Sequence, residues 1–125
     1  MLRKLNILTV DDELPIIYSL RFALGSPERV VASASDGEEA LTRIRTHEPP
    51  FDVVITDNNM PRVNGLLLVR RLRDLSFGGK IVVLSANLSD EMRAAYEALH
   101  VDRLVPKPFD VAKLREVVEE LAATA

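Results

Sequence analysis

Short apolar runs and helical patterns alternate along the whole chain. The apolar runs are Leu5–Val10, Val30–Ala34, Asp52–Thr56, Lys80–Ser85 and Arg103–Val105. Three of them are rich in Val and Ile and almost continuously apolar, which is typical of strands buried on both faces of a parallel sheet. Between the runs, apolar residues recur three or four positions apart, which is the spacing of amphipathic helices.

Start signals support a helix after each of these strands. Pro15 suits the first turn of a helix over residues 14–24. Asp36 and Glu39 resemble a capping box ahead of the second helix. The other three helices are expected over residues 65–75, 89–99 and 110–123.

Five strands that alternate with five helices predict an α/β fold of the (βα)5 type. Right-handed crossovers then produce an open, doubly wound parallel sheet with helices on both faces. We find no linker, repeat or low-complexity segment, and the last predicted helix nearly exhausts the chain. Residues 1–125 are therefore expected to form a single domain.

Composition narrows the possible functions. The formal net charge is −3 over 125 residues, which argues against direct binding of nucleic acid by this domain. Cysteine is absent, so disulfides and thiol chemistry are excluded. No apolar run approaches the roughly 20 residues that span a membrane, and a signal peptide is not evident. We expect a soluble, cytoplasmic protein without membrane association.

Polar residues follow the predicted strands at the edge where ligands of open α/β sheets gather. Three carboxylates that converge there would repel one another, and a divalent cation would relieve the repulsion. Hard oxygen ligands in a small cluster suit Mg²⁺. The residues are Asp11 and Asp12 after the first strand, Asp57 after the third, Ser85 at the end of the fourth and Lys107 after the fifth.

Asp57 is a plausible nucleophile in such a cluster. A carboxylate can form an acyl phosphate. The metal and Lys107 would neutralise charge on the transferring phosphoryl group, and Ser85 would donate a hydrogen bond to it. The neighbouring Ala86 is small and leaves access to the site.

Four short motifs resemble those of one known family. They are Val10-Asp11-Asp12-Glu13, then Asp57-Asn58-Asn59-Met60-Pro61 with Gly65 eight residues after Asp57, then Ser85-Ala86, and finally Lys107-Pro108-Phe109. In this order, at successive strand ends, they resemble the receiver domain of bacterial two-component response regulators, of the chemotaxis-regulator type. The resemblance covers essentially the whole chain.

The resemblance implies a role for each site residue. Asp57 would be the phosphoacceptor, and Ser85 and Lys107 would contact the phosphoryl oxygens. Mg²⁺ or Mn²⁺ would be bound directly by Asp12, Asp57 and the backbone carbonyl of Asn59. Asp11 would act on the metal mainly through a water molecule.

The resemblance also implies topology and partners. The strand order would be 2-1-3-4-5, and the Lys107–Pro108 bond would be cis. A phosphohistidine on a sensor histidine kinase or histidine phosphotransfer protein would donate the phosphoryl group, and an effector protein or domain would respond. The resemblance is also compatible with a weak homodimer that forms through helix 89–99, strand 103–105 and the last helix. The domain would not be an enzyme, because it would catalyse only its own phosphorylation and dephosphorylation.

Two positions depart from the family pattern. The family usually carries Tyr or Phe three residues before its lysine, where this chain has Leu104. The usual movement of an aromatic ring toward the site is therefore not available to this residue. His100 replaces a common glycine, so the preceding helix is expected to end without the easy left-handed residue.

Three other functions are compatible with parts of the sequence. A Mg²⁺-dependent phosphohydrolase would also use an aspartyl nucleophile, but such enzymes typically carry a second Asp where this chain has Asn59. A nucleotide-binding module would need a glycine-rich phosphate loop, and neither common form is present; flavin binding fits the fold, but the acidic cluster would repel its phosphate. A degenerate receiver that acts only in protein contacts is the third alternative, and Leu104 favours it.

The remaining distinctive residues have structural interpretations. Leu14 and Ile16, at the exposed start of the first helix, suit either a kinase-docking surface or an ordinary amphipathic helix. The residues interpreted as packing are Tyr18, Tyr96 and the four Phe, and those interpreted as a solvated helix face are Arg70, Arg71 and Arg73.

Overall fold

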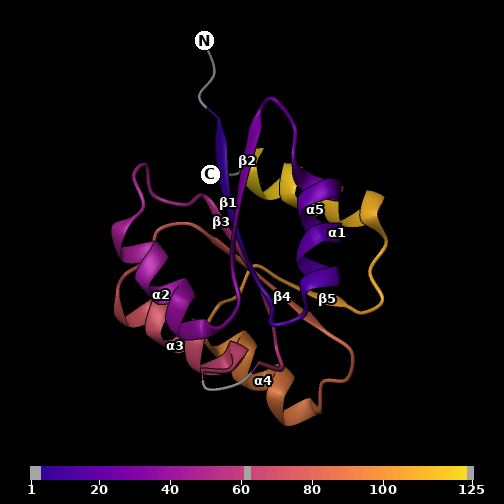
Figure 1. Cartoon of the computed structure of the whole chain (residues 1–125). Coiled ribbons are helices and arrows are strands. Elements are labelled where there is room, and N and C mark those ends of the chain that lie inside the picture. The colour runs from indigo at the N-terminus through magenta and orange to yellow at the C-terminus, as the bar shows by residue number, and fades with distance from the viewer. Residues whose placement is uncertain (1–3, 61–62, 124–125) are drawn as a thin grey trace.

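The predicted alternation of strands and helices is confirmed. A computed structural model describes residues 4–60 and 63–123. Its elements are β1 (Leu5–Val10), α1 (Leu14–Leu24), β2 (Arg29–Ala34), α2 (Gly37–Thr46), β3 (Val53–Asp57), α3 (Gly65–Asp74), β4 (Lys80–Ser85), α4 (Asp90–Ala98), β5 (Arg103–Pro106) and α5 (Val111–Ala123). The strands form a parallel sheet in the order β2-β1-β3-β4-β5 (Figure 1), as the resemblance implied.

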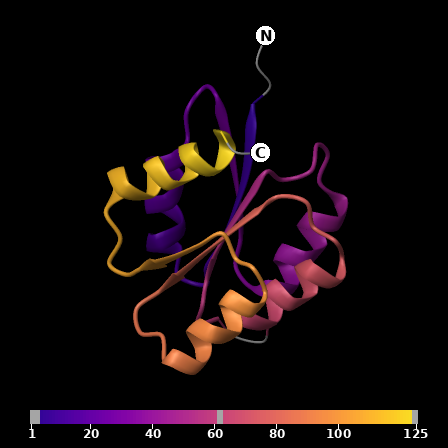
Figure 2. The ribbon, with the colours of Figure 1, turned by 180° about the vertical axis from the view of Figure 1, so that it is seen from behind.

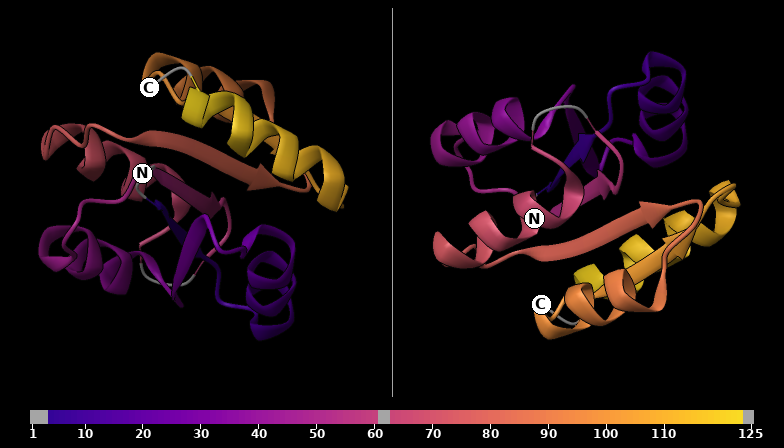
Figure 3. Two further views of the ribbon diagram at one scale, coloured as in Figure 1. Left: turned by 90° about the horizontal axis from the view of Figure 1, so that it is seen from above. Right: turned by 90° about the horizontal axis from the view of Figure 1, so that it is seen from below.

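Helices cover both faces of this sheet. Helices α1 and α5 lie together on one face, and α2, α3 and α4 lie together on the other, as the view from behind shows clearly (Figure 2). Views from above and below show the twisted strands between these helical layers (Figure 3). Each face has its own core, with Leu20, Leu24, Leu114 and Val118 on the first side and Leu41, Leu68, Leu72 and Tyr96 on the second.

The central strands explain the continuous apolar runs. Strands β1, β3 and β4 are buried along almost their whole length, because each has a neighbouring strand on either side and helices above and below. The edge strands β2 and β5 are more exposed. Burial on both faces removes the polar alternation that a half-exposed strand would show.

Strand β3 ends one residue later than the sequence pattern predicted. Asp57 is its last residue, because the parallel register with β4 continues to the pair Asp57 and Leu84. Strand β5 likewise extends to Pro106, which pairs with Ser85. The phosphoacceptor candidate is therefore held by the sheet itself.

Side chains cap the starts of α2, α3, α4 and α5, the last through Asp110, which accepts a hydrogen bond from the Ala112 N–H at 2.8 Å. Asp36 accepts a hydrogen bond from the Glu39 N–H at 2.8 Å, Asn64 caps α3, and Ser89 caps α4. The Glu39 carboxylate accepts from the N–H of Ser35 at 2.6 Å, one residue before the position in the usual capping box. The cap at Asp36 is confirmed, with its return contact shifted by one residue.

Some packing predictions are wrong. Tyr18 and Phe22 are 61% and 89% exposed, because they lie on the outer side of α1 while Ile17 and Leu20 face the core. The helix predicted over residues 65–75 ends one residue earlier, at Asp74, and Leu75 beyond it is 44% exposed.

The end of α4 also differs from expectation. His100 itself adopts the left-handed conformation, with φ of 59°. Arg73, predicted on a solvated face, is half-buried and donates hydrogen bonds to the carbonyls of Leu99 and His100, each at 2.8 Å. These bonds fix the turn, so a non-glycine residue is held in a conformation that glycine adopts more easily.

Removing the cap of α2 tests how strongly it fixes this helix. We expect Asp36→Ala to lower the free energy of unfolding by about 0.5–2 kcal/mol, because the Glu39 N–H loses its acceptor. Urea denaturation measures the change. Glu38→Ala, at an exposed position of the same turn, should change stability by less than about 0.5 kcal/mol. Equal losses in both variants would contradict the capping role.

Candidate functional site

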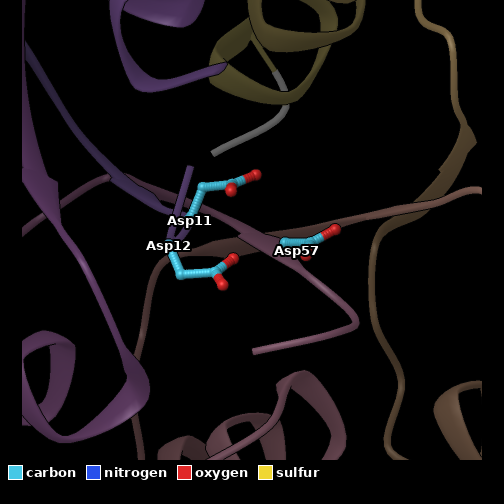
Figure 4. A group of neighbouring side chains, drawn as sticks. All are labelled: Asp11, Asp12 and Asp57. Atoms are coloured by element: carbon cyan, nitrogen blue, oxygen red, sulfur yellow. The ribbon is translucent and has the colours of Figure 1, made fainter. Parts of the chain in front are cut away.

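Three carboxylates meet at the carboxyl edge of the sheet. Asp11 and Asp12 directly follow β1, and Asp57 is the last residue of β3. The three side chains lie beside one another (Figure 4). One carboxylate oxygen from each residue lies within 4.8 Å of those of the other two. Asp11 and Asp57 are buried, whereas Asp12 is exposed. The cluster therefore opens toward solvent on the side of Asp12.

Lys107 reaches the same cluster from the end of β5. Its Nζ atom lies 2.7 Å from Asp57 Oδ1 and 3.6 Å from Asp11 Oδ2. The Lys107 N–H donates to the carbonyl of Ser85 at 2.9 Å, and the Lys107–Pro108 bond is cis. Residues from three strand ends thus converge, and Lys107 contacts both buried carboxylates.

The pKa shifts reflect this crowding. Burial raises the pKa of Asp11; the charges of Asp57 and Asp12 raise it further, against a hydrogen bond from the Glu13 N–H and the charge of Lys107. Burial alone would lower the pKa of Lys107, but the hydrogen bond to Asp57 and the nearby carboxylates raise it overall. The ammonium stays charged and carries one positive charge against three carboxylates.

The donor set fits a hard divalent cation. Two buried atoms, Asp11 Oδ2 and Ser85 Oγ, have no hydrogen-bond partner among the described residues. Asp12 and Asn59 line one hollow of ≈ 500 Å³ that leads to the cluster's exposed side. Clustered carboxylate oxygens with excess negative charge are the environment that Mg²⁺ prefers. An unpaired hydroxyl beside it remains available to a further ligand.

The predicted site residues lie at one edge of the sheet, and Asn59 lines the same hollow as Asp12. Asp11, Asp12, Asp57 and Lys107 lie in direct proximity, and Ser85 ends the strand beside β5. Pro61, part of the motif after Asp57, lies outside the described residues.

Tyr96 makes a polar contact next to the site that no sequence pattern predicted. Tyr96, interpreted only as a packing residue, is fully buried, and its hydroxyl donates a hydrogen bond to Asn58 Oδ1. Burial, and to a smaller extent the charge of Asp57, raise the pKa of Tyr96, so the hydroxyl stays protonated. Spacing from Met92 and Leu99 places Tyr96 on the buried face, but no sequence signal identifies its polar partner.

Residues 7–119 match the response regulator receiver domain family, and the chain belongs to that family. It is 38% identical to the virulence sensor protein BvgS of Bordetella bronchiseptica over 97% of this chain and 10% of that protein. It is also 38% identical to the response regulator MprA of Mycolicibacterium vanbaalenii, over 87% of this chain and 46% of that protein. The chain thus spans less than half of each of these relatives.

Solved structures agree with this assignment. The chemotaxis protein CheY4 of Vibrio cholerae superposes with a TM-score of 0.86 at 28% identity, covering 94% of this chain and 98% of that one. A response regulator receiver protein from Pseudomonas putida superposes with a TM-score of 0.87 at 27% identity, covering 96% and 99%. The fold is therefore that of the receiver domains.

Family membership defines the general role. Receiver domains are signalling domains that act as phosphorylation-dependent switches in two-component systems, and the family binds Mg²⁺ at an acidic cluster. Within residues 4–60 and 63–123, none of the helices has the length and apolar character to cross a membrane.

Gly65 offers a test of how tightly the site is packed from behind. A Cβ atom there would lie 2.6 Å from the Asp57 carbonyl oxygen and 2.8 Å from the Tyr96 hydroxyl. We expect Gly65→Ala to destabilise the fold by about 1–3 kcal/mol, because backbone atoms cannot easily move aside. Gly78→Ala is the control for urea denaturation, since its Cβ would meet nothing within 4 Å. Equal stability of the two variants would contradict the close packing.

Proposed function

We propose that this chain is a signalling switch that accepts a phosphoryl group on Asp57 in a Mg²⁺-dependent reaction. The observation that carries this proposal is the position of Asp57: it shares an acidic cluster with Asp11 and Asp12 and contacts Lys107 at 2.7 Å. The donor is a phosphohistidine on a sensor histidine kinase or a histidine phosphotransfer protein.

The metal is the first requirement of this chemistry. Asp12, Asp57 and the backbone carbonyl of Asn59 would hold Mg²⁺ or Mn²⁺ directly, with Asp11 acting through water. Bound metal supplies positive charge that neutralises the phosphoryl oxygens. Asp11 Oδ2 accepts no hydrogen bond among the described residues, and three carboxylates face the single ammonium of Lys107; both observations support this assignment.

Side chains of the protein carry out the phosphoryl transfer itself. A carboxylate oxygen of Asp57 attacks phosphorus, the phosphorus–nitrogen bond breaks, and the departing imidazole keeps the electron pair. Lys107 neutralises charge on the phosphoryl oxygens, and Ser85, whose hydroxyl has no partner among the described residues, donates to one of them. Water later cleaves the acyl phosphate and restores the carboxylate of Asp57.

Turnover of a separate substrate is not part of this proposal. A phosphohydrolase with an aspartyl nucleophile would need a general acid, yet Asn59 stands two residues after Asp57, and Asn58 is held by Tyr96. A degenerate receiver would not need Asp57 and Lys107 in contact. The chain is thus a switch that catalyses only its own phosphorylation and dephosphorylation.

Surfaces around the site would bind the partners of the switch. Leu14, exposed at the start of α1, and the exposed Tyr18 and Phe22 extend away from the acidic edge, and this surface suits the phosphodonor. An effector protein or domain would respond to the phosphorylated state, and a weak homodimer would use α4, β5 and α5. Residues 1–125 act as a single cytoplasmic domain.

Phosphorylation by a small donor tests the nucleophile. With Mg²⁺ and acetyl phosphate, we expect intact mass spectrometry to detect one labile phosphoryl adduct on the wild type and none on Asp57→Asn, because the amide is not a nucleophile of this kind. Chelation of the metal should abolish labelling. Asp74→Asn, an exposed change on α3, is the matched control and should label normally. Equal labelling of Asp57→Asn and wild type would refute the assignment.

Metal binding is tested without any phosphodonor. Asp12→Asn should weaken Mg²⁺ affinity, measured by calorimetry, by about tenfold or more, because ligand-shell changes typically cost 10–100-fold. Thermal stabilisation by Mg²⁺ should fall in parallel, since a ligand stabilises the folded state according to its affinity. The Asp74→Asn control should bind as the wild type does. Unchanged affinity in Asp12→Asn would exclude this carboxylate as a ligand.

A further inference from the structure

A buried polar contact joins α4 to the loop that follows Asp57. Tyr96 lies in the last turn of α4 and is among the largest fully buried side chains. Its hydroxyl donates to the side-chain carbonyl of Asn58, a residue 38 positions away in the sequence. Asn58 is itself buried and directly follows Asp57. The contact therefore joins α4 to the residue next to the proposed phosphoacceptor.

Asn58 is fixed by hydrogen bonds to three different elements. Its N–H donates to the carbonyl of Leu84 in β4 at 3.0 Å, and its carbonyl accepts from the N–H of Gly65 at 3.1 Å. The third bond comes from Tyr96. Two of these bonds hold the backbone, and the bond from Tyr96 alone among them holds the side chain. A change in the position of Asn58 must therefore either move Tyr96 of α4 or break the hydrogen bond between them.

Gly65 provides the space for this arrangement. The position of its missing Cβ lies within 2.9 Å of the Asn58 Cα atom, as well as close to the Asp57 carbonyl and the Tyr96 hydroxyl. The start of α3, the loop after β3 and the last turn of α4 therefore meet without an intervening side chain. Groups packed this closely move together.

Because Leu104 is aliphatic, the polar contact next to Asp57 on this side comes from Tyr96 of α4 and not from β5. Leu104 is half-buried and packs against the same core cluster as Tyr96, but it has no polar group that could bond to the site. Tyr96 thus presents a ring and a hydroxyl beside the phosphoacceptor from α4, whereas β5 offers only an alkyl chain there. Both polar ends of the Tyr96–Asn58 pair are buried, so breaking the bond leaves a group unpaired.

We propose that Tyr96 is a positioning residue that holds the loop after Asp57 through Asn58, and that this bond transmits the state of the loop to α4. The inference rests on the proposed phosphorylation of Asp57. Asn59, whose carbonyl is the proposed metal ligand, follows Asn58 immediately, so the orientation of Asn58 sets where that carbonyl lies. A phosphoryl group on Asp57 would displace this loop and, through the bond to Tyr96, the helix.

The conservative variant Tyr96→Phe tests both parts of the inference. It keeps the ring in the core and removes only the hydroxyl. With Mg²⁺ and acetyl phosphate, we expect phosphoryl uptake on Asp57 to slow by about tenfold, because slight misplacement of reacting groups is costly. The change in amide hydrogen exchange across residues 90–98 that accompanies phosphorylation in the wild type should be lost. Asp74→Asn, an exposed change on α3, is the control and should retain both properties.

A second variant removes the acceptor instead of the donor. Asn58→Ala should reproduce the slower uptake and the loss of the α4 response, and it serves the test if circular dichroism shows that Tyr96→Phe is unfolded. The double variant should behave as each single one does, because both remove the same bond; additive effects would indicate separate structural damage and overturn the inference.

The two proposals fail in different ways. Absence of a phosphoryl adduct on the wild type would overturn the proposed function. A labelled wild type whose α4 exchange does not change would overturn the inference alone. So would a Tyr96→Phe protein that is labelled at the wild-type rate and keeps the α4 response.

Discussion

The convergence of three carboxylates at one edge of the sheet is the constraint on which the rest of the structure depends. A parallel order of β2-β1-β3-β4-β5 brings the ends of β1 and β3 side by side, so Asp11, Asp12 and Asp57 cannot avoid one another. Lys107 offsets part of the repulsion, and burial raises the pKa of Asp11. Further positive charge would stabilise such an edge, which is why the proposed cation site and the proposed phosphoryl site share it.

Asp57 and Asn58 are held in place by backbone pairing and by hydrogen bonds next to this edge. Asp57 belongs to β3 and is fixed by its register with β4. Asn58 then makes backbone bonds to Leu84 and Gly65 and a side-chain bond to Tyr96. The proposed nucleophile, Asp57, is therefore held by the sheet on one side and by a packed, hydrogen-bonded loop on the other. Groups that are positioned before reaction do not have to be ordered during it.

The departures from the family pattern have separate structural consequences. His100 takes the left-handed conformation that a glycine would take, and Arg73 holds the turn by bonding to the carbonyls of residues 99 and 100. This ties the residues just after α4 to α3, while Tyr96 ties the last turn of α4 to the loop after β3. Leu104 contributes packing but no polar contact. Helix α4 is therefore linked to the site by groups on α3 and α4 rather than by an aromatic residue on β5.

Local sequence patterns were enough to predict the alternation of elements, the buried character of β1, β3 and β4, and the edge at which the polar residues gather. These features follow from local periodicity and from the rule that parallel strands end on one side. Only the tertiary structure decided that Asp57 lies within β3, that Arg73 closes the turn at His100, and that Tyr18 and Phe22 remain uncovered. It also joined Tyr96 to Asn58, because a hydrogen bond between residues far apart in the chain depends on how helices and loops pack, and a single side chain's type carries no information about its distant partner.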